Sequence, residues 1–299
     1  MKYVNRNCPI CGSDNDSQVY AEANFDETKL DHYSFASRKY PEFMHYRLVI
    51  CPVCELLYAT HIPQNDWLNG AYVQAQYDSG KESYYAARTY RKHFLRILSN
   101  LPDKKSALDI GAGNGSFLEY LQEAGFDQIE GIEPSEAPIE AAKADIKKLI
   151  KRSVFSPNSF SPSHYSLITC FQTLEHMDHI NDVFASVNRS LKPGGAFLVV
   201  IHDYRSYLSK IIGTKSPIFD IEHLQLFSAK SIQYVFNTTG FKAISVNSIS
   251  NCYPLHYWIK LLPLGTSLKA GLISLLKKIY IGHIPISLKV GNMVAVGYK

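Results

Sequence analysis

The sequence predicts an α/β domain, in which a mostly parallel sheet is covered by helices on both faces, preceded by a small cysteine-containing module. From residue 106 onward, short apolar segments alternate with amphipathic ones, which is typical of strand–helix units in a parallel sheet. A glycine-rich turn follows the first apolar segment, and two C-x-x-C motifs occur before residue 60. These observations predict a module at 1–75 and an α/β domain at 76–299.

Each predicted element rests on apolar periodicity and on the residues that bound it. Ser135, followed by an acidic residue, is expected to cap the helix that it begins. Residues 1–75 are expected to be irregular. The predicted strands are 106–110, 128–132, 149–154, 165–171, 196–201, 241–249 and 292–298, and the predicted helices are 83–101, 116–124, 135–145, 180–191 and 229–239.

The last two predicted strands are separated by residues 253–287. Within this insertion, residues 268–280 show the apolar spacing of a helix. We expect the insertion to pack against the domain and to act as a lid over a substrate. The alternative is a helix that lies on a membrane surface.

The composition is that of an ordinary globular protein, with 46% hydrophobic and 19% charged residues. The net charge of +4 is too small to indicate nucleic-acid binding by itself. The first twenty residues contain no apolar signal segment, and no run of eighteen apolar residues occurs in the chain. We therefore expect a cytoplasmic protein without a transmembrane segment.

The glycine-rich turn, Asp109-Ile-Gly111-Ala-Gly113-Asn-Gly115, lies between a predicted strand and a predicted helix. Glycines let the backbone turn tightly and approach a ligand without interference from a Cβ atom. Ligands of doubly wound sheets bind beside such a turn, at the carboxyl ends of the strands. Turns of this kind also serve dinucleotides, so the motif alone indicates a nucleotide-like cofactor without naming it.

Glu133 narrows the choice, because it ends the second strand 22 residues after Gly111. A carboxylate at this position can accept hydrogen bonds from both hydroxyls of a ribose. The turn and Glu133 together indicate an adenosyl group; a solvated carboxylate at a strand end is the alternative.

Four segments of the chain resemble, in order and spacing, the signature segments of the class I, Rossmann-like, S-adenosylmethionine-dependent methyltransferases. They are ALDIGAGNGSF (107–117), GIEPS (131–135), YSLITCFQTLEH (165–176) and LKPGGAFLVV (191–200). The resemblance covers residues 80–250. It implies a Rossmann-like fold, S-adenosylmethionine as cofactor and transfer of the cofactor's methyl group.

Carried over residue by residue, the resemblance implies that the glycine-rich turn lines the methionine part of the cofactor and that Asp109 orients this turn. Glu133 is implied to hold the ribose, and Pro134 to pack on the adenine. These roles concern positions that match the family's motif in this sequence.

Further along the chain, Phe171 and Gln172 are implied to lie under the methionine and ribose. Many relatives place an aspartate after the third strand to contact the adenine amino group, whereas this chain has Ser153 there, with the backbone of Val154 as an alternative contact. The implied cofactor-binding set is Asp109, Gly111, Ala112, Gly113, Asn114, Gly115, Glu133, Pro134, Ser153, Val154, Phe171 and Gln172.

Cys8, Cys11, Cys51 and Cys54 form the two C-x-x-C pairs. In a reducing compartment such pairs indicate metal ligands rather than disulfides. Four thiolates make a closed tetrahedral site without a position for water, so we expect one structural Zn²⁺. Redox-active or unliganded cysteines are the alternative. An N-terminal zinc ribbon on this core resembles sugar C-methyltransferases and a set of ribosomal RNA guanine methyltransferases.

Three histidines are candidates for removing a proton from the methyl acceptor. His223 lies in an H-L-x-x-F-S segment that resembles a substrate-facing segment of small-molecule methyltransferases, and it is our first choice. His202 follows the fifth strand and is the second choice. His176 ends the fourth-strand motif, where a structural role is the alternative. Asp203 and Glu222 are expected to be solvated or capping carboxylates.

We therefore expect methyl transfer to a small-molecule acceptor, with a sugar or sugar-nucleotide as one candidate. The acceptor pocket is expected between the cysteine module, residues 202–227 and residues 253–287. One alternative is an RNA methyltransferase that binds RNA through the zinc ribbon. The low net charge and the acidic residues within 14–31 disfavour binding of nucleic acid. Another is a non-catalytic binding protein, which the intact turn and Glu133 disfavour. The methylated atom and the oligomeric state are left open.

Overall fold

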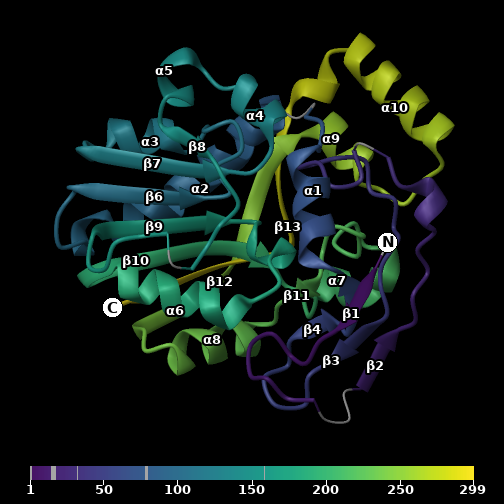
Figure 1. The fold of residues 1–299 in the computed structure, drawn as a ribbon. Helices are drawn as coiled ribbons and strands as arrows, with labels where there is room; N and C mark the ends of the chain where they lie inside the picture. The colour runs from purple at the N-terminus through teal and green to yellow at the C-terminus, as the bar shows by residue number, and fades with distance from the viewer. Residues whose placement is uncertain (1, 15–17, 32, 78–79, 158) are drawn as a thin grey trace.

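The computed structural model describes residues 2–14, 18–31, 33–77, 80–157 and 159–299 and is built around a seven-stranded sheet (Figure 1). Its strands are β6 (Ser106–Ile110), β7 (Gln128–Glu133), β8 (Ile150–Arg152), β9 (Tyr165–Phe171), β10 (Leu191–His202), β12 (Lys242–Pro254) and β13 (Pro285–Tyr298). The spatial order is β12-β13-β10-β9-β6-β7-β8. The five strands from β8 to β10 are parallel, and β13 runs antiparallel to both of its neighbours. The predicted mostly parallel sheet is confirmed.

Helices cover both faces of this sheet, as predicted (Figure 1). Side chains of β9 alternate between the faces, so Ile168 packs with the helices of one side and Leu167 with those of the other. All seven residues of β9 are buried, as in strands that are covered on both faces and are therefore mostly apolar. Its two polar residues, Ser166 and Thr169, donate hydrogen bonds to the carboxylates of Asp103 and Asp109. One face carries α6 (Ile180–Ser190) and α8 (Ala229–Thr238), and the other carries α2 (Gly80–Ile97) with η2 (Leu98–Asn100) and α3 (Leu118–Glu123).

Several boundaries differ from the prediction. The helix expected at 135–145 is two short helices, α4 (Glu136–Glu140) and α5 (Ala144–Lys147). Ser135 does stand at the N-cap position, but its hydroxyl donates to the carbonyl of Ala75 at 2.9 Å instead of capping the helix. The last two strands are longer than expected, because they continue past the sheet as a two-stranded ribbon.

The N-terminal region is not irregular, and that expectation is wrong. Strands β1 (Tyr3–Asn5) and β5 (His61–Pro63) pair with each other. Strands β2 (Gln18–Ala21), β3 (Leu48–Ile50) and β4 (Leu57–Ala59) form a sheet that is completed by β11 (Gln225–Leu226), and η1 (Glu27–Lys29) and α1 (Asn65–Val73) accompany these strands. Strands this short carry little periodicity of their own, and their partner β11 lies far away in the sequence.

Arg6 ties this region to the rest of the molecule. Its guanidinium donates to the carbonyl oxygens of Ala59 at 2.8 Å and Leu224 at 2.6 Å, and it forms an ion pair with Asp178 at 3.1 Å. The side chain is only 9% exposed. A buried arginine is stable only when its donors are paired, so these contacts hold the segment before Gln225 against β4.

Replacing Arg6 with methionine is expected to destabilise the protein by about 3–5 kcal/mol, since the Asp178 carboxylate and two carbonyls would lose their partner. Denaturant unfolding measures the change. The matched control is Arg91→Met, because Arg91 forms an exposed ion pair with Glu123 at 3.5 Å and should contribute less than about 1 kcal/mol. An equal, small effect of both substitutions would contradict the anchoring role of Arg6.

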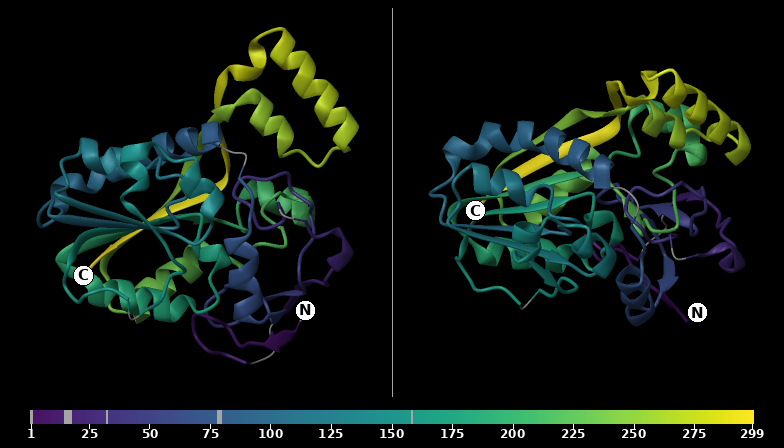
Figure 2. Two further views of the ribbon diagram at one scale, coloured as in Figure 1. Left: turned by 45° about the horizontal axis from the view of Figure 1, so that its top comes forward. Right: turned by 90° about the horizontal axis from the view of Figure 1, so that it is seen from above.

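The insertion forms a helical hairpin at the end of the β12–β13 ribbon. It consists of α9 (Leu255–Lys260), α10 (Thr266–Lys278) and η5 (Ile281–His283). Tyr257 and Trp258 of α9 are buried, and Figure 2 shows α10 projecting from the body of the molecule. The ammonium groups of Lys260 and Lys269 lie 4.6 Å and 5.9 Å from the ring centroid of Tyr40, so the hairpin touches the N-terminal region. No helix among the described residues is long and apolar enough to cross a bilayer.

Candidate active site

The candidate site lies at the carboxyl ends of β6 and β9, where the order of the parallel strands reverses direction. β6 pairs with β9 on one side and β7 on the other. The chain leaves β6 toward α3 and leaves β9 toward η3 (Leu174–His176), so a crevice opens between the two departing loops. The amide nitrogens of Gly111 and Ala112 both donate to the carbonyl of Ile132 at 2.9 Å, which fixes the glycine-rich turn against the end of β7.

The glycines of this turn serve two purposes. An added Cβ on Gly111 would overlap the side chain of Thr173, so glycine there allows close packing. Gly113 has a φ of +55°, and an added Cβ would meet no described atom within 4 Å, which leaves its backbone open to a ligand. Gly115 is not among the residues that line the crevice; an added Cβ on it would overlap the side chain of Ile146, so close packing requires glycine there.

Glu133 is held at the end of β7 by backbone donors. Its Oε2 accepts from the amide of Gly113 at 2.9 Å and its Oε1 from the amide of Ser135 at 3.0 Å. Burial raises the pKa of Glu133, and the two amides oppose this shift. Each carboxylate oxygen keeps a further acceptor site, so the fixed carboxylate can still accept two hydroxyl hydrogens.

Asp109 is 3% exposed, and its Oδ1 accepts from the hydroxyl of Thr169 at 2.7 Å. Burial raises the pKa of Asp109 to about 7, with the nearby Glu133 adding to the shift. A carboxyl group with such a pKa ionises fully only when a positive charge comes close. Asp109 lines the crevice, so a cationic ligand group could supply that charge.

The remaining predicted cofactor residues also line the crevice. Phe171 stacks on Tyr90 with a centroid separation of 4.5 Å, and Tyr90 donates its hydroxyl hydrogen to Gln172 at 3.0 Å. Gln172 adopts a φ of +49°, a strained conformation for a residue with a side chain. Further lining comes from Ala112, Asn114, Pro134, Ser153 and Val154.

The crevice is one end of a cavity that has a volume of about 590 Å³ in all. Its walls come from the N-terminal region at 35–39, from the segment that follows β10, and from the hairpin through Tyr257 and Trp258. The three segments expected to surround the acceptor therefore meet at one cavity. The segment after β10 includes α7 (Tyr207–Ile212) and η4 (Gly213–Lys215).

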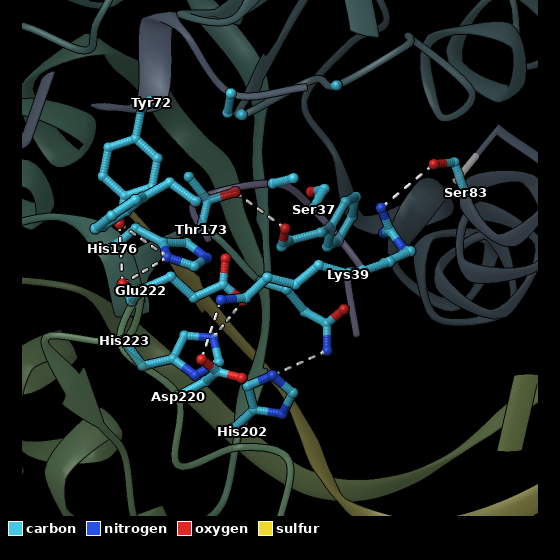
Figure 3. Close-up of a pocket in the computed structure, with 18 of the residues that line it drawn as sticks. Ser37, Lys39, Tyr72, Ser83, Thr173, His176, His202, Asp220, Glu222 and His223 are labelled. Atoms are coloured by element: carbon cyan, nitrogen blue, oxygen red, sulfur yellow. Dashed lines mark hydrogen bonds and ion pairs between the residues drawn. The ribbon is translucent and has the colours of Figure 1, made fainter. Parts of the chain in front are cut away.

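The three candidate histidines gather in this cavity (Figure 3). The ring centroid of His223 lies 5.0 Å from that of His176 and 5.2 Å from that of His202. Burial lowers the pKa of all three, to about 4 for His176 and His202 and well below 6.5 for His223. All three rings are therefore neutral at pH 7 and carry one lone pair each.

Their hydrogen bonds determine where that lone pair lies. His223 Nδ1 contacts the carbonyl oxygen of Ile218 at 2.8 Å, and His176 Nδ1 contacts that of Glu222 at 2.9 Å. A carbonyl can only accept, so both rings carry their proton on Nδ1 and their lone pair on Nε2. His176 Nδ1 also lies 3.2 Å from the hydroxyl of Tyr72, so His176 is fixed between two elements.

A family described as "Methyltransferase domain" matches residues 83–246. The chain belongs to the methyltransferase family. This match, together with the sheet order, confirms the resemblance to class I S-adenosylmethionine-dependent methyltransferases that the four signature segments indicated.

Individual relatives of the methyltransferase match part of its chain and are themselves methyltransferases by name. The ubiquinone biosynthesis O-methyltransferase of Methylococcus capsulatus is 27% identical over 146 residues, covering 46% of this chain and 61% of that protein. The protein of the same name from Nitrosospira multiformis is 32% identical over 120 residues, covering 37% of this chain and 49% of that protein. The matched regions thus span about half to three fifths of these relatives. The YcgJ protein from Bacillus subtilis shares the fold with a TM-score of 0.50 at 17% identity, covering 71% of this chain and 98% of that chain.

The methyltransferase carries a second cluster, made of the four cysteines of the N-terminal region. Their Sγ atoms all lie within 4.8 Å of one another. Two C-x-x-C turns of the same shape form the cluster: the amide of Gly12 donates to Cys8 O at 2.8 Å, and that of Glu55 to Cys51 O at 3.0 Å. Four thiolates at the corners of a tetrahedron with bonds of about 2.3 Å fit this spacing, so the cluster has the donors and the size for one Zn²⁺.

Some residues of the methyltransferase's cavity were not predicted. Glu222 is not a solvated carboxylate, because it is 9% exposed, lines the cavity and has a pKa raised to about 7 by burial. Lys39 pairs with Glu42 and, at 3.0 Å, with Asp220 (Figure 3). Arg38 also lines the cavity.

Arg38 has an unusual environment for an arginine. Its Nη1 donates to the hydroxyl of Ser83 at 3.3 Å, while its Nε is buried and has no hydrogen-bond partner among the described residues. Its backbone has a φ of +58°. The sequence around Arg38 contains no motif that would have singled it out; only the fold brings it to the cavity.

Proposed function

We propose that this methyltransferase transfers a methyl group from S-adenosylmethionine to a small-molecule acceptor bound in the cavity. The single observation that carries the proposal is that the glycine-rich turn, Glu133 and the three histidines line one continuous cavity. A cofactor site and a set of proton acceptors in the same cavity are what group transfer to a bound acceptor requires.

The residues at the cofactor end fit an adenosyl amino acid. Glu133 has acceptor sites left for the ribose hydroxyls, and the open backbone of Gly113 allows the methionine part to approach. Asp109 is suited to an ammonium group, because a neighbouring positive charge would stabilise its ionised form. When bound, S-adenosylmethionine supplies a methyl group activated by a sulfonium charge.

The acceptor end of the cavity, the part lined by the histidines, Arg38 and the hairpin, combines apolar walls with a few polar groups. Tyr257 and Trp258 provide apolar surface, whereas the buried Nε of Arg38 is a donor that finds no partner in the part of the chain that the structure describes. Such a donor favours an acceptor with an acidic group, which supports a sugar-nucleotide phosphate as one candidate. The name of the matched relatives, O-methyltransferase, favours an oxygen nucleophile, which must lose a proton during transfer.

We assign that proton to His223. Its Nε2 carries the lone pair and lies 3.8 Å from Oε1 of Glu222. A carboxylate at this distance stabilises the imidazolium that forms when His223 takes a proton. His202 is the second candidate. Its Nε2 lies 3.5 Å from the amide nitrogen of Gln172, and this contact occupies the lone pair that would have to accept the proton. His176 is better suited to positioning Glu222.

The cysteine cluster is proposed to hold one structural Zn²⁺. Cys51 and Cys54 are 0% exposed and pack into the same apolar cluster as α6 and α8. Four protein ligands leave no position for an acceptor or a water, so this site would stabilise the fold and take no part in methyl transfer.

Calorimetry with S-adenosylmethionine and S-adenosylhomocysteine tests the cofactor assignment. Glu133→Ala is expected to weaken binding by about 1–3 kcal/mol, the cost of losing a charged acceptor for two hydroxyls. Glu136→Ala is the matched control, because Glu136, the first residue of α4, forms an exposed ion pair with Arg152 of β8 and should leave affinity unchanged. Equal affinity of both variants, or no binding by the folded protein, would refute the assignment.

The affinity should also depend on pH through Asp109. Its pKa of about 7 in the free protein falls when a cationic ligand binds, so binding releases a proton below pH 7. Affinity is therefore expected to fall as pH drops below 7, by at most about tenfold per pH unit for this group. Calorimetry between pH 5.5 and 7.5 in buffers of different ionisation enthalpy measures the proton release, and Asp109→Asn should reduce it.

A further inference from the structure

The hairpin and the neighbouring helix α7 expose an unusual amount of apolar surface. Leu268, Leu275 and Ile279 of α10 and its end are each at least 50% exposed. These positions follow helical spacing and form one stripe along α10. A surface helix normally buries such a stripe against the core, whereas this stripe faces away from the molecule. Exposed apolar side chains of the same region are Tyr207, Leu208, Ile211, Leu262, Leu264, Tyr280, Ile281, Ile284 and Leu288.

The charge of this region has one sign. From His223 to the C-terminus the sequence contains eight lysines and neither aspartate nor glutamate. Lys277 and Lys278 occupy the last turn of α10, and Lys210 of α7 and Lys289 of β13 are also exposed. Apolar side chains flanked by lysines are typical of a face that contacts anionic lipid headgroups with its apolar side chains in the acyl boundary.

The mouth of the cavity lies on the same face. Leu208, Leu262 and Leu288 each line the cavity and are each at least 36% exposed. These three leucines therefore belong both to the wall of the cavity and to the exposed face. Figure 2 shows the hairpin standing at the edge of the molecule, where a flat surface could reach it.

We propose that α7, α9–α10 and residues 279–289, together called the apolar face, bind the surface of a membrane that contains anionic lipids. A second copy of the chain is disfavoured as the occupant, because a two-fold contact would bring lysines of like charge together without acidic partners. An acceptor with an apolar chain would enter the cavity from the bilayer; that consequence rests on the proposed function.

Co-sedimentation with vesicles tests the proposal. The full chain is expected to sediment with vesicles of phosphatidylcholine and phosphatidylglycerol, to do so much less with phosphatidylcholine alone, and to dissociate at high salt. The double variants Leu268→Ser/Leu275→Ser and Lys277→Gln/Lys278→Gln should each lower partitioning by about tenfold or more. Both pairs are exposed, so the fold should be retained.

Matched controls lie on other surfaces. Leu95→Ser removes a leucine of α2 that is 45% exposed, and Lys148→Gln/Lys151→Gln removes two exposed lysines near β8; neither should change partitioning. Loss of vesicle binding in these controls, absence of binding at low salt, or conversion of a dimer to a monomer by Leu268→Ser/Leu275→Ser would overturn the proposal. Cofactor calorimetry on the same samples tests the proposed function separately, because the apolar face lies outside the cofactor end.

Discussion

Cys51→Ser is expected to abolish metal binding and to unfold the N-terminal region. The purified wild-type protein should contain about one zinc per chain, and the variant should contain none. The free energy of zinc binding that is coupled to folding of small metal-dependent domains is about 10–16 kcal/mol. This exceeds the free energy of unfolding of many domains, which is about 5–15 kcal/mol. The sulfur of Cys51 is completely buried, so an unliganded polar group there would find no solvent.

The effect should extend beyond the cluster. The cysteines share an apolar cluster with α6 and α8, and Arg6 connects the same region to the segment that carries His223. Loss of zinc should therefore lower the thermal midpoint of the whole chain. Cys252→Ser, which changes a half-buried cysteine outside the cluster, is the control and should keep its zinc. A fully folded, metal-free wild-type protein from zinc-replete cells would contradict the structural role.

Replacing His223 is expected to have the second large effect, on turnover. His223→Asn should slow methyl transfer about 10²- to 10⁴-fold, the usual contribution of a general base, while S-adenosylhomocysteine binds as in the wild type. Asparagine can still donate to the carbonyl of Ile218, so this variant removes the Nε2 lone pair and keeps the local hydrogen bond. Turnover on a panel of phenols and sugar-nucleotides measures the effect.

The pH profile separates a base from a structural residue. Glu222, with a pKa near 7, should be ionised for His223 to accept a proton easily, so the wild-type rate should rise as pH increases through 7. This rise should disappear in Glu222→Gln. His61→Ala changes an exposed histidine that does not line the cavity and should leave the rate unchanged. Unchanged turnover in His223→Asn would transfer the role to His202.

The sequence was most informative where local pattern and tertiary structure agree. β9 runs over Tyr165–Phe171, the predicted range, because a strand buried on both faces is a mostly apolar segment that stands out in the sequence. The glycine-rich turn and Glu133 were recognisable because their backbone geometry demands particular residue types at fixed spacing. Gly115 shows the limit of such motifs, since its glycine is required by packing against Ile146 rather than by the crevice.

The acceptor end could not be predicted to the same extent. Arg38, Lys39 and Glu222 come from segments without regular periodicity, and only tertiary contacts bring them to one cavity. The sequence predicts that Glu222 is a solvated or capping carboxylate. In the structure, Tyr72 and His176 both donate hydrogen bonds to its backbone carbonyl and hold it at the cavity. The strands of the N-terminal region were missed for a related reason, because β11, which completes their sheet, follows them by more than a hundred residues.

A crystal structure of the protein with bound S-adenosylhomocysteine would show where the cofactor lies relative to Glu133 and His223, and it requires no known acceptor. We expect the ribose hydroxyls to contact the carboxylate of Glu133 and the sulfur to face the cavity. The ring of His223 should lie within about 10 Å of the sulfur, near enough for an acceptor to lie between them. A cofactor bound away from Glu133 would contradict the assigned cofactor site, and a His223 ring that lies farther from the sulfur and faces solvent would contradict its role as the base.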